Sequence, residues 1–298
     1  MDRKALLREI QRNPIEFVPA KMVVSSYPGE WTSPFEGKGY EPMGYREFTL
    51  GDDPRRMHMP ATTRRGEPTI VERVALRDFK LMVVIDISPS MQVRSKLAIQ
   101  LEAAALLLYS AWQAETTYAF ALRTERGAQS FGLGIGSRHF YRLYGILWEI
   151  CNDGETSHRG TPMHISRCLP PNSMLLYCSD FLGADGTIVN RKKLASAASR
   201  YDFVPIIVQD ELEYGFPIAP YGSFIPLSNP ETGTRREVWI APKTAREIHA
   251  MHQARYLELC AFFRAHGVKP LHLDIPGVVN IRQSIDAYFR HRKRARKA

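Results

Sequence analysis

The residues in this chain best suited to chemistry are oxygen donors that follow two apolar runs. The segment Asp86-Ile87-Ser88-Pro89-Ser90 comes directly after one apolar run and places a carboxylate and two hydroxyls in a short turn. Asp180 follows another apolar run, and Thr161 lies in the segment that precedes that run. Hard oxygen donors of this kind suit Mg²⁺ or Mn²⁺. The sequence therefore predicts a metal site made of Asp86, Ser88, Ser90, Thr161 and Asp180.

A simpler interpretation of the same residues stays open. Asp and Ser at the start of a helix often cap its free backbone N–H groups. Asp86 and Ser88 could cap the helix that follows them, and Asp180 could cap its own helix. The two interpretations predict different results for Asp86→Ala. If the residue serves a metal, the substitution weakens partner binding far more than it lowers stability, whereas loss of a cap lowers both equally.

Apolar strands that alternate with helices are expected to position these residues. The runs Leu81–Ile85, Ser173–Cys178 and Phe203–Val208 are continuous and apolar, as in strands buried on both faces of a parallel sheet. The intervening segments show helical patterns, and the alternation predicts an α/β fold with a doubly wound, mostly parallel, Rossmann-like sheet. Ligands bind at the carboxyl ends of the strands in such sheets. Both Asp86 and Asp180 fall at such ends.

Further elements follow from local patterns. The sequence predicts these helices and strands besides the three buried strands: helices over Leu97–Leu108, Phe140–Ile150, Ile188–Ser199, Thr244–His266 and Ser284–Arg292, and strands over Thr117–Leu122 and Leu271–Ile275. Gly267 is a suitable C-cap for the longest helix. The glycines Gly132, Gly134 and Gly136 are interpreted as a turn.

The chain divides into stretches of different composition. Residues 1–77 begin with a short amphipathic helix and continue through a Gly- and Pro-rich segment, which is typical of short strands and turns. Residues 78–290 hold the α/β pattern, interrupted at about 215–240 by a predicted β-hairpin. Residues 291–298 form a basic tail. We therefore expect one α/β domain with an N-terminal β-rich segment and a hairpin insertion.

The five oxygen donors resemble the metal-ion-dependent adhesion site of von Willebrand factor type A domains. The wider chain, from about Tyr27 to Arg290, is similar to the bacterial family called domain of unknown function fifty-eight, whose members carry such a domain. The similar segments outside the site are Glu47-Phe48, Gly51-Asp52-Asp53-Pro54-Arg55-Arg56, Thr62-Thr63-Arg64, Val208-Gln209-Asp210 to Glu213, Asn229-Pro230-Glu231-Thr232-Gly233, and Asp286 with Tyr288, Phe289 and Arg290.

The resemblance implies a role for each donor. Ser88, Ser90 and Thr161 would coordinate Mg²⁺ through their hydroxyls, and Asp86 and Asp180 would hold it directly or through water. One coordination position would stay open for an acidic side chain of a partner protein. Family members are commonly linked to AAA+ ATPases of the MoxR type in chaperone-like maturation or stress responses. The resemblance thus implies a Mg²⁺-dependent protein–protein interaction module with a MoxR-type ATPase as its partner.

Enzyme signatures do not accompany the site. The sequence contains no GxSxG elbow, no HExxH pair and no GxxxxGK[ST] loop. A serine nucleophile, Ser88 or Ser90, would need His158 or His164 as its base, and neither histidine has a recognisable spacing to a third group. We therefore expect a protein that is not an enzyme.

Positive charge is concentrated at the C-terminus. The formal net charge is +9, and six basic residues lie among the last nine, namely Arg290, Arg292, Lys293, Arg294, Arg296 and Lys297. Together with Arg123, Arg126, Arg138 and Arg142 they support an alternative function, binding of nucleic acid or another acidic surface. No zinc finger, RNP motif or helix-turn-helix pattern accompanies them. A solvated helix end is the simpler interpretation.

Location is predicted from what the sequence lacks. No stretch reaches the roughly 18 uninterrupted apolar residues of a membrane-spanning helix. The N-terminal residues alternate in charge, unlike a secretory signal. The four cysteines, Cys151, Cys168, Cys178 and Cys260, are far apart and form no CxxC pair, which favours a reducing compartment. We expect a cytoplasmic protein without a membrane span.

Overall fold

The computed structural model describes most of the chain. The described residues are 3–19, 42–49, 57, 59–73, 80–92, 95–124, 127–153, 160–162, 165–183, 186–210, 213, 219–228 and 235–295. They belong to two compact units, one formed by Met1–Lys21 with Phe79–Ala298 and the other by Met22–Asp78. Helix α1 (Arg3–Gln11) is thus part of the larger unit, whereas the sequence predicted that it belongs with the β-rich segment in residues 1–77.

The larger unit is built on a mostly parallel sheet. Among the described residues it has seven strands in the order β11-β8-β7-β3-β4-β5-β6. The strands are β3 (Lys80–Asp86), β4 (Thr117–Thr124), β5 (Gly127–Gly134), β6 (Thr161–Pro162), β7 (Met174–Ser179), β8 (Asp202–Val208) and β11 (Leu271–Leu273). Neighbours from β11 to β4 pair in parallel, whereas β5 is antiparallel to β4 and β6 is antiparallel to β5. This confirms the predicted α/β class and its Rossmann-like arrangement.

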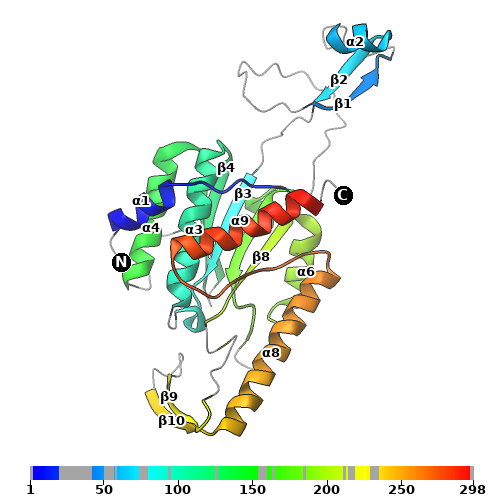
Figure 1. The fold of residues 1–298 in the computed structure, drawn as a ribbon. Coiled ribbons are helices and arrows are strands. Elements are labelled where there is room, and N and C mark those ends of the chain that lie inside the picture. Colours follow the sequence, from blue (N-terminus) through cyan, green and yellow to red (C-terminus); the bar gives the residue numbers. More distant parts are fainter. Residues whose placement is uncertain are drawn as a thin grey trace. The chain divides into compact units, whose positions relative to one another are not determined.

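Helices pack on both faces of this sheet (Figure 1). The core on one face joins the sheet to α1, α3 (Lys96–Gln113), α4 (Gly136–Asp153) and α9 (Val278–Ala295). The other core joins it to α5 (Ile165–Cys168), α6 (Arg191–Arg200) and α8 (Pro242–Ala265). Along β3, Leu81 and Val83 enter the first core and Met82 and Val84 enter the second. Burial on both faces explains why this strand is continuously apolar.

Strand β5 corrects the interpretation of the glycine-rich stretch as a turn. Gly132 and Gly134 lie within the strand, and Gly132 has a φ of +81°. The register between β4 and β5 shifts between Ala119 and Ala121, which is the irregularity of a β-bulge. A glycine tolerates the positive φ that such a bulge needs. Gly132 therefore shapes the strand, whereas Gly134 is its last residue and Gly136 is the first residue of α4.

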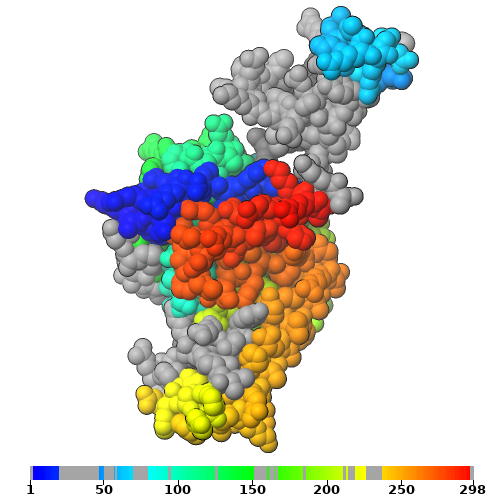
Figure 2. Space-filling model, viewed as in Figure 1, coloured from blue at the N-terminus to red at the C-terminus, as the bar shows by residue number. Residues whose placement is uncertain are grey.

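The C-terminal elements agree with the sequence in type and differ in extent. β9 (Ser223–Ser228) and β10 (Arg235–Ile240) form the predicted hairpin, whereas its predicted turn at 229–233 lies outside the described residues. Helix α8 ends just before Gly267, whose φ of +71° fits a C-cap. Helix α9 continues to Ala295, through most of the predicted basic tail. Figure 2 shows α9 and the N-terminal segment side by side on the surface of the larger unit.

The smaller unit contains a two-stranded antiparallel sheet of β1 (Pro42–Glu47) and β2 (Thr69–Arg73), together with α2 (Met59–Arg65). The Thr62-Thr63-Arg64 segment lies on α2, and the Thr62 hydroxyl accepts a hydrogen bond from the backbone N–H of Thr69 at 3.0 Å. The Gly51–Arg56 segment lies outside the described residues. Across the described parts of both units, every helix is too short or too polar to cross a membrane.

Candidate functional site

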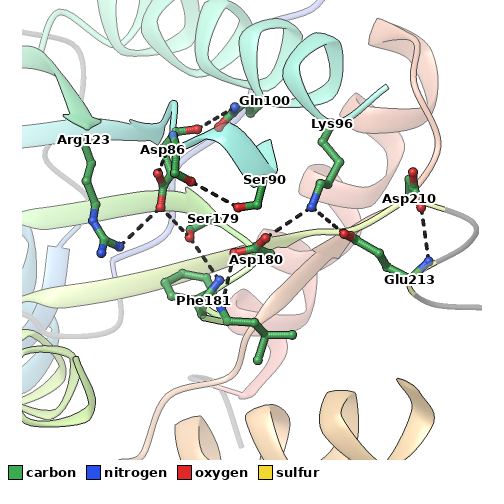
Figure 3. Close-up of polar contacts among 12 residues, drawn as sticks. Asp86, Ser90, Lys96, Gln100, Arg123, Ser179, Asp180, Phe181, Asp210 and Glu213 are labelled. Atoms are coloured by element: carbon green, nitrogen blue, oxygen red, sulfur yellow. Dashed lines mark hydrogen bonds and ion pairs between the residues drawn. The ribbon is translucent and has the colours of Figure 1, made fainter. Parts of the chain in front are cut away.

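The centre of the site is the carboxylate of Asp86, the last residue of β3 (Figure 3). Its Oδ1 accepts a hydrogen bond from the backbone N–H of Ser88 at 3.0 Å. Its Oδ2 accepts bonds from Ser179 Oγ at 2.9 Å and from Arg123 Nη1 at 3.3 Å. Gln100 on α3 donates to the Asp86 backbone carbonyl at 2.8 Å. The carboxylate is buried and fixed by groups from three different strands or turns.

Two hydroxyls lie in the turn after β3. Ser88 Oγ and Ser90 Oγ are 3.3 Å apart and can share a hydrogen bond. Ser90 belongs to a single 3₁₀ turn, Pro89–Met91, and the Ser88 side chain makes no capping bond to that turn. The structure therefore does not support the interpretation of Ser88 as a side-chain cap. Adjacent ligands around an octahedral Mg²⁺ lie about 3 Å apart, which is close to this spacing.

Asp180 follows β7 and is buried. Its Oδ1 accepts a weak bond from the backbone N–H of Leu182 at 3.3 Å, and its Oδ2 lies 3.2 Å from Lys96 Nζ. Phe181, the next residue, has a φ of +58°, which is unfavourable for a side chain of this size. Its ring packs edge-on against Phe263 at 5.1 Å, and this burial offsets the strain. The strained turn directs Asp180 toward α3.

Lys96 brings a buried positive charge into the site. Its Nζ contacts Asp180 and also Glu213 Oε1, at 2.7 Å, and its side chain is 1% exposed. Burial lowers the pKa of the Lys96 ammonium, but the attraction of Asp180 and Glu213 outweighs burial and raises that pKa above its ordinary value. Asp210 Oδ1 accepts a bond from the Glu213 backbone N–H at 3.1 Å. The ammonium group therefore stays charged between two carboxylates.

Arg123 supplies a second positive charge. Its Nη1 bridges Asp86 Oδ2 and the hydroxyl of Tyr177, the latter at 2.9 Å. Burial raises the pKa of Tyr177, so its phenol remains protonated. Arg123 is one of the arginines whose charge in the sequence suggests binding of nucleic acid. The structure places it instead beside the carboxylate of the predicted metal site.

Thr161 is located by its backbone. It lies in β6 and pairs with Ser130 of β5, next to Gly160. Its side chain is outside the described residues, so the position of its hydroxyl stays a prediction. Of the other predicted donors, Asp86, Ser88 and Ser90 are joined by direct contacts, and Asp180 follows Ser179, which binds Asp86.

Sequence reasoning missed four residues of this cluster: Ser179, Lys96, Arg123 and Glu213. One of them carried a usable signal, because Lys96 is a cation in the first turn of a mostly apolar helix. The helix dipole disfavours a positive charge at that position. A buried lysine there indicates nearby carboxylates, although not which ones.

The donor chemistry fits a divalent cation. Within the described residues no group of three or more His, Cys, Asp or Glu side chains could hold a metal ion. The predicted set depends instead on hydroxyls, with a carboxylate from each of two strand ends. The carboxylates of the cluster are those of Asp86, Asp180, Asp210 and Glu213, and its basic groups are those of Lys96 and Arg123. Their formal charges leave −2, which a divalent cation would neutralise.

Residues of the basic tail have structural contacts. Arg292 forms an ion pair with Asp202, whose side chain is 2% exposed, and its guanidinium lies 5.5 Å from the centre of the Tyr288 ring. Lys293 Nζ contacts Glu16 Oε1 at 2.7 Å. These contacts hold the end of α9 against the body of the larger unit. Arg292 is thus an anchor of this helix.

The fold and the polar cluster define an α/β protein with a Rossmann-like, mostly parallel sheet and a charged site at the carboxyl ends of β3 and β7. Within this class, the chain belongs to the DUF58 family. The family model described as "Protein of unknown function DUF58" matches residues 44–257.

Solved structures resemble the chain more distantly. The pilus adhesin SpaC from Lactobacillus rhamnosus GG, in its open conformation, matches with 10% sequence identity and a TM-score of 0.34, covering 73% of this chain and 30% of the adhesin. A second structure of that adhesin matches with 10% identity and a TM-score of 0.34, covering 73% of this chain and 31% of the adhesin. The match thus spans less than a third of the adhesin. No curated protein matches the chain.

Proposed function

We propose that this protein is a Mg²⁺-dependent protein-binding module. The metal would be held by Asp86, Ser88, Ser90, Thr161 and Asp180, as in the metal-ion-dependent adhesion site of von Willebrand factor type A domains, and Mn²⁺ could replace Mg²⁺. One observation carries the proposal: the two hydroxyls after β3 lie at ligand spacing beside a carboxylate that Ser88 N–H and Ser179 hold in place.

The electrostatics of the cluster support a bound divalent cation that attracts an acid. Its formal charge of −2 favours such a cation. The ligands in contact with the metal would be mainly neutral hydroxyls, so the metal's open coordination position would still present positive charge to a partner although the cluster as a whole would be neutral. Ser88 and Ser90 would provide neutral ligands, and the orientation of Asp86 is already set. An Asp or Glu of a partner protein is therefore the proposed last ligand.

The proposed partner is a MoxR-type AAA+ ATPase, in chaperone-like maturation or a stress response in the cytoplasm. This part of the proposal rests on the resemblance to the family and on the acidic ligand that the site would accept. The protein would act by binding and not by catalysis, because Ser88 and Ser90 would serve as metal ligands and not as nucleophiles.

Calorimetric titration of Mg²⁺ and Mn²⁺ into the full chain tests the site. We expect saturable binding by the wild type and its loss in Ser90→Ala and Thr161→Ala, with circular dichroism showing that both variants are folded. Ser137→Ala, which removes an exposed hydroxyl at the start of α4, is the matched control and should bind like the wild type. Absence of saturable binding by the folded wild type would overturn the metal site.

Partner binding needs a separate test. We expect a purified MoxR-type ATPase to bind the wild type in the presence of Mg²⁺ and to dissociate when EDTA is added. Asp86→Ala should weaken this binding far more than it lowers the free energy of unfolding. Equal losses in both quantities would mean that Asp86 only supports the local fold. Binding that is insensitive to EDTA would reject the metal-dependent mechanism.

A further inference from the structure

We infer that Lys96 is a resident cation of the site that competes with a metal ion for Asp180 and thereby sets the affinity for that ion. Lys96 Nζ lies 3.2 Å from Asp180 Oδ2 and 2.7 Å from Glu213 Oε1. Figure 3 shows the ammonium group between these two carboxylates. The inference rests on the proposed function, because Asp180 is one of the proposed metal ligands.

Burial makes Lys96 costly unless it has a charged partner. The side chain is almost fully buried in the first turn of α3, where both desolvation and the helix dipole disfavour a cation. An apolar residue would suit a mostly apolar helix better. The lysine therefore serves the two acids beside it, and its position depends on them.

Lys96 Nζ has two acceptors at unequal distances, which allows Asp180 to be shared between the ammonium group and a metal ion. Glu213 is the nearer acceptor and Asp180 the more distant one. When Asp180 turns toward a metal ion, Glu213 still neutralises the ammonium group, so no buried charge is left without a partner. Glu213 thus lowers the cost of releasing Asp180. Loss of either charge should shift metal affinity, and the two losses should act in opposite directions.

The direction of each shift follows from Coulomb's law. Lys96→Met removes a positive charge beside the metal position and frees Asp180, so affinity for Mg²⁺ should rise about tenfold or more. Glu213→Gln leaves Lys96 dependent on Asp180 alone, so affinity should fall about tenfold. A lysine with only a structural role would give weaker binding in both variants, because each would disturb the site.

Two control variants isolate these effects from a change in net charge. Lys269→Met removes an exposed positive charge just before β11, at the opposite end of the sheet from the site, and should leave affinity unchanged. Asp210→Asn removes a negative charge next to Glu213 but keeps an oxygen to accept the Glu213 N–H bond. Asp210→Asn should change Mg²⁺ affinity less than Glu213→Gln does. Within the described part of the chain, Lys96 Nζ contacts Asp180 and Glu213 and not Asp210.

Calorimetric titration of Mg²⁺ into the full-length wild type and these variants is decisive. Tighter binding by Lys96→Met with weaker binding by Glu213→Gln supports the inference. Affinities within threefold of the wild type, or weaker binding by both variants, overturn it and leave the proposed function standing. If Lys96→Met does not fold, the comparison of Glu213→Gln with Asp210→Asn decides, since equal effects overturn the inference.

Failure of the proposed function gives a different pattern. Binding by Lys96→Met without binding by the wild type would support Lys96 as the competing cation and reject Mg²⁺ binding by the natural protein. Absence of binding by the wild type and by every folded variant would overturn both proposals.

Discussion

Ser179 Oγ donates a hydrogen bond to Asp86 Oδ2 at 2.9 Å, which links the ends of β7 and β3. Ser179 Oγ also accepts a hydrogen bond from the backbone N–H of Phe181 at 3.0 Å. A serine hydroxyl has a single proton to donate. Because the Asp86 carboxylate can only accept, the hydroxyl proton is directed to Asp86, while Oγ accepts the bond from Phe181 N–H. The turn after β7 therefore orients the carboxylate after β3.

Ser179→Ala should damage both stability and metal affinity. It removes a bond to a buried carboxylate and leaves the Phe181 N–H without its acceptor, at a cost of about 1.5–3 kcal/mol in the free energy of unfolding. We also expect Mg²⁺ affinity to fall about tenfold, since Asp86 loses its orientation. Urea unfolding and calorimetric titration measure the two effects. Ser173→Ala, which changes a buried serine at the other end of β7, is the control. Equal losses of Mg²⁺ affinity in the two variants would contradict the prediction.

Gly160→Ala should displace the strand that carries Thr161. A Cβ at Gly160 would lie 2.9 Å from Gln129 Cβ and 3.1 Å from the Ser130 carbonyl oxygen. Relief of this overlap should cost about 1–3 kcal/mol and move β6 away from β5. Weaker Mg²⁺ binding would follow if Thr161 is a ligand. Urea unfolding and titration test this expectation.

The same substitution at Gly145 is the control for that experiment. Gly145 lies within α4, and the nearest atom to its added Cβ would be Arg3 Nη2 at 3.7 Å. Alanine should therefore stabilise the helix by about 0.5–1 kcal/mol without altering Mg²⁺ affinity. Unchanged affinity in Gly160→Ala despite lower stability would show that Thr161 is not needed for the metal.

Elements with a strong local pattern could be predicted from the sequence. β3 and β7 are continuously apolar because both of their faces are buried, and donors lie at or just after the end of each strand. β5 could not be predicted, because its glycines accommodate a bulge that depends on pairing with β4. Burial on both faces determines the residues of β3 and β7, and this leaves a pattern in the sequence. Pairing with β4 determines the glycines of β5, and this leaves no such pattern.

The contacts between donors depend on tertiary structure. Ser179 is 93 positions from Asp86, and Lys96 is 84 positions from Asp180. No periodicity connects residues so far apart, and only the order of the strands brings them together. Asp86 and Ser88 were predictable because a short turn joins them, whereas the charges that neutralise the site were not.

Arg292 should contribute to stability and not only to surface charge. Its ion pair with Asp202 is nearly buried, so Arg292→Met takes this ion pair away from a buried carboxylate at a cost of about 3–5 kcal/mol. Arg294→Met removes an exposed charge from the same turn and should change stability by less than about 0.5 kcal/mol. Urea unfolding compares the two variants. Equal free energies of unfolding in the two variants would mean that Arg292, like Arg294, is a solvated residue of the basic tail.

Asp202→Asn completes a double-mutant cycle with Arg292→Met. The two substitutions should be strongly non-additive, because each removes the same ion pair. Additive losses would instead assign the effect of Arg292 to its packing on the Tyr288 ring.

Glu102 should make stability depend on pH. The side chain is 7% exposed and its Oε2 accepts a bond from the Gly277 N–H at 2.8 Å. Burial raises the pKa of Glu102 above its ordinary value of 4.5, and the Gly277 bond opposes this only in part. The folded state therefore holds the proton more tightly than the unfolded state. Stability is lost as the pH rises from 4.5 through the raised pKa, by about 1.4 kcal/mol for each pH unit between the two pKa values.

Glu102→Gln removes this titration and keeps an oxygen to accept the Gly277 bond. The variant's free energy of unfolding, relative to the wild type, should therefore increase as the pH rises from 4.5 through the raised pKa, and then stay constant. Glu115→Gln, at an exposed position just after α3, should show no such increase. Urea unfolding of all three proteins at closely spaced pH values measures the difference. A constant difference between Glu102→Gln and the wild type would mean that Glu102 has the same pKa in the folded and unfolded states, and that burial in α3 is fully balanced by the Gly277 bond.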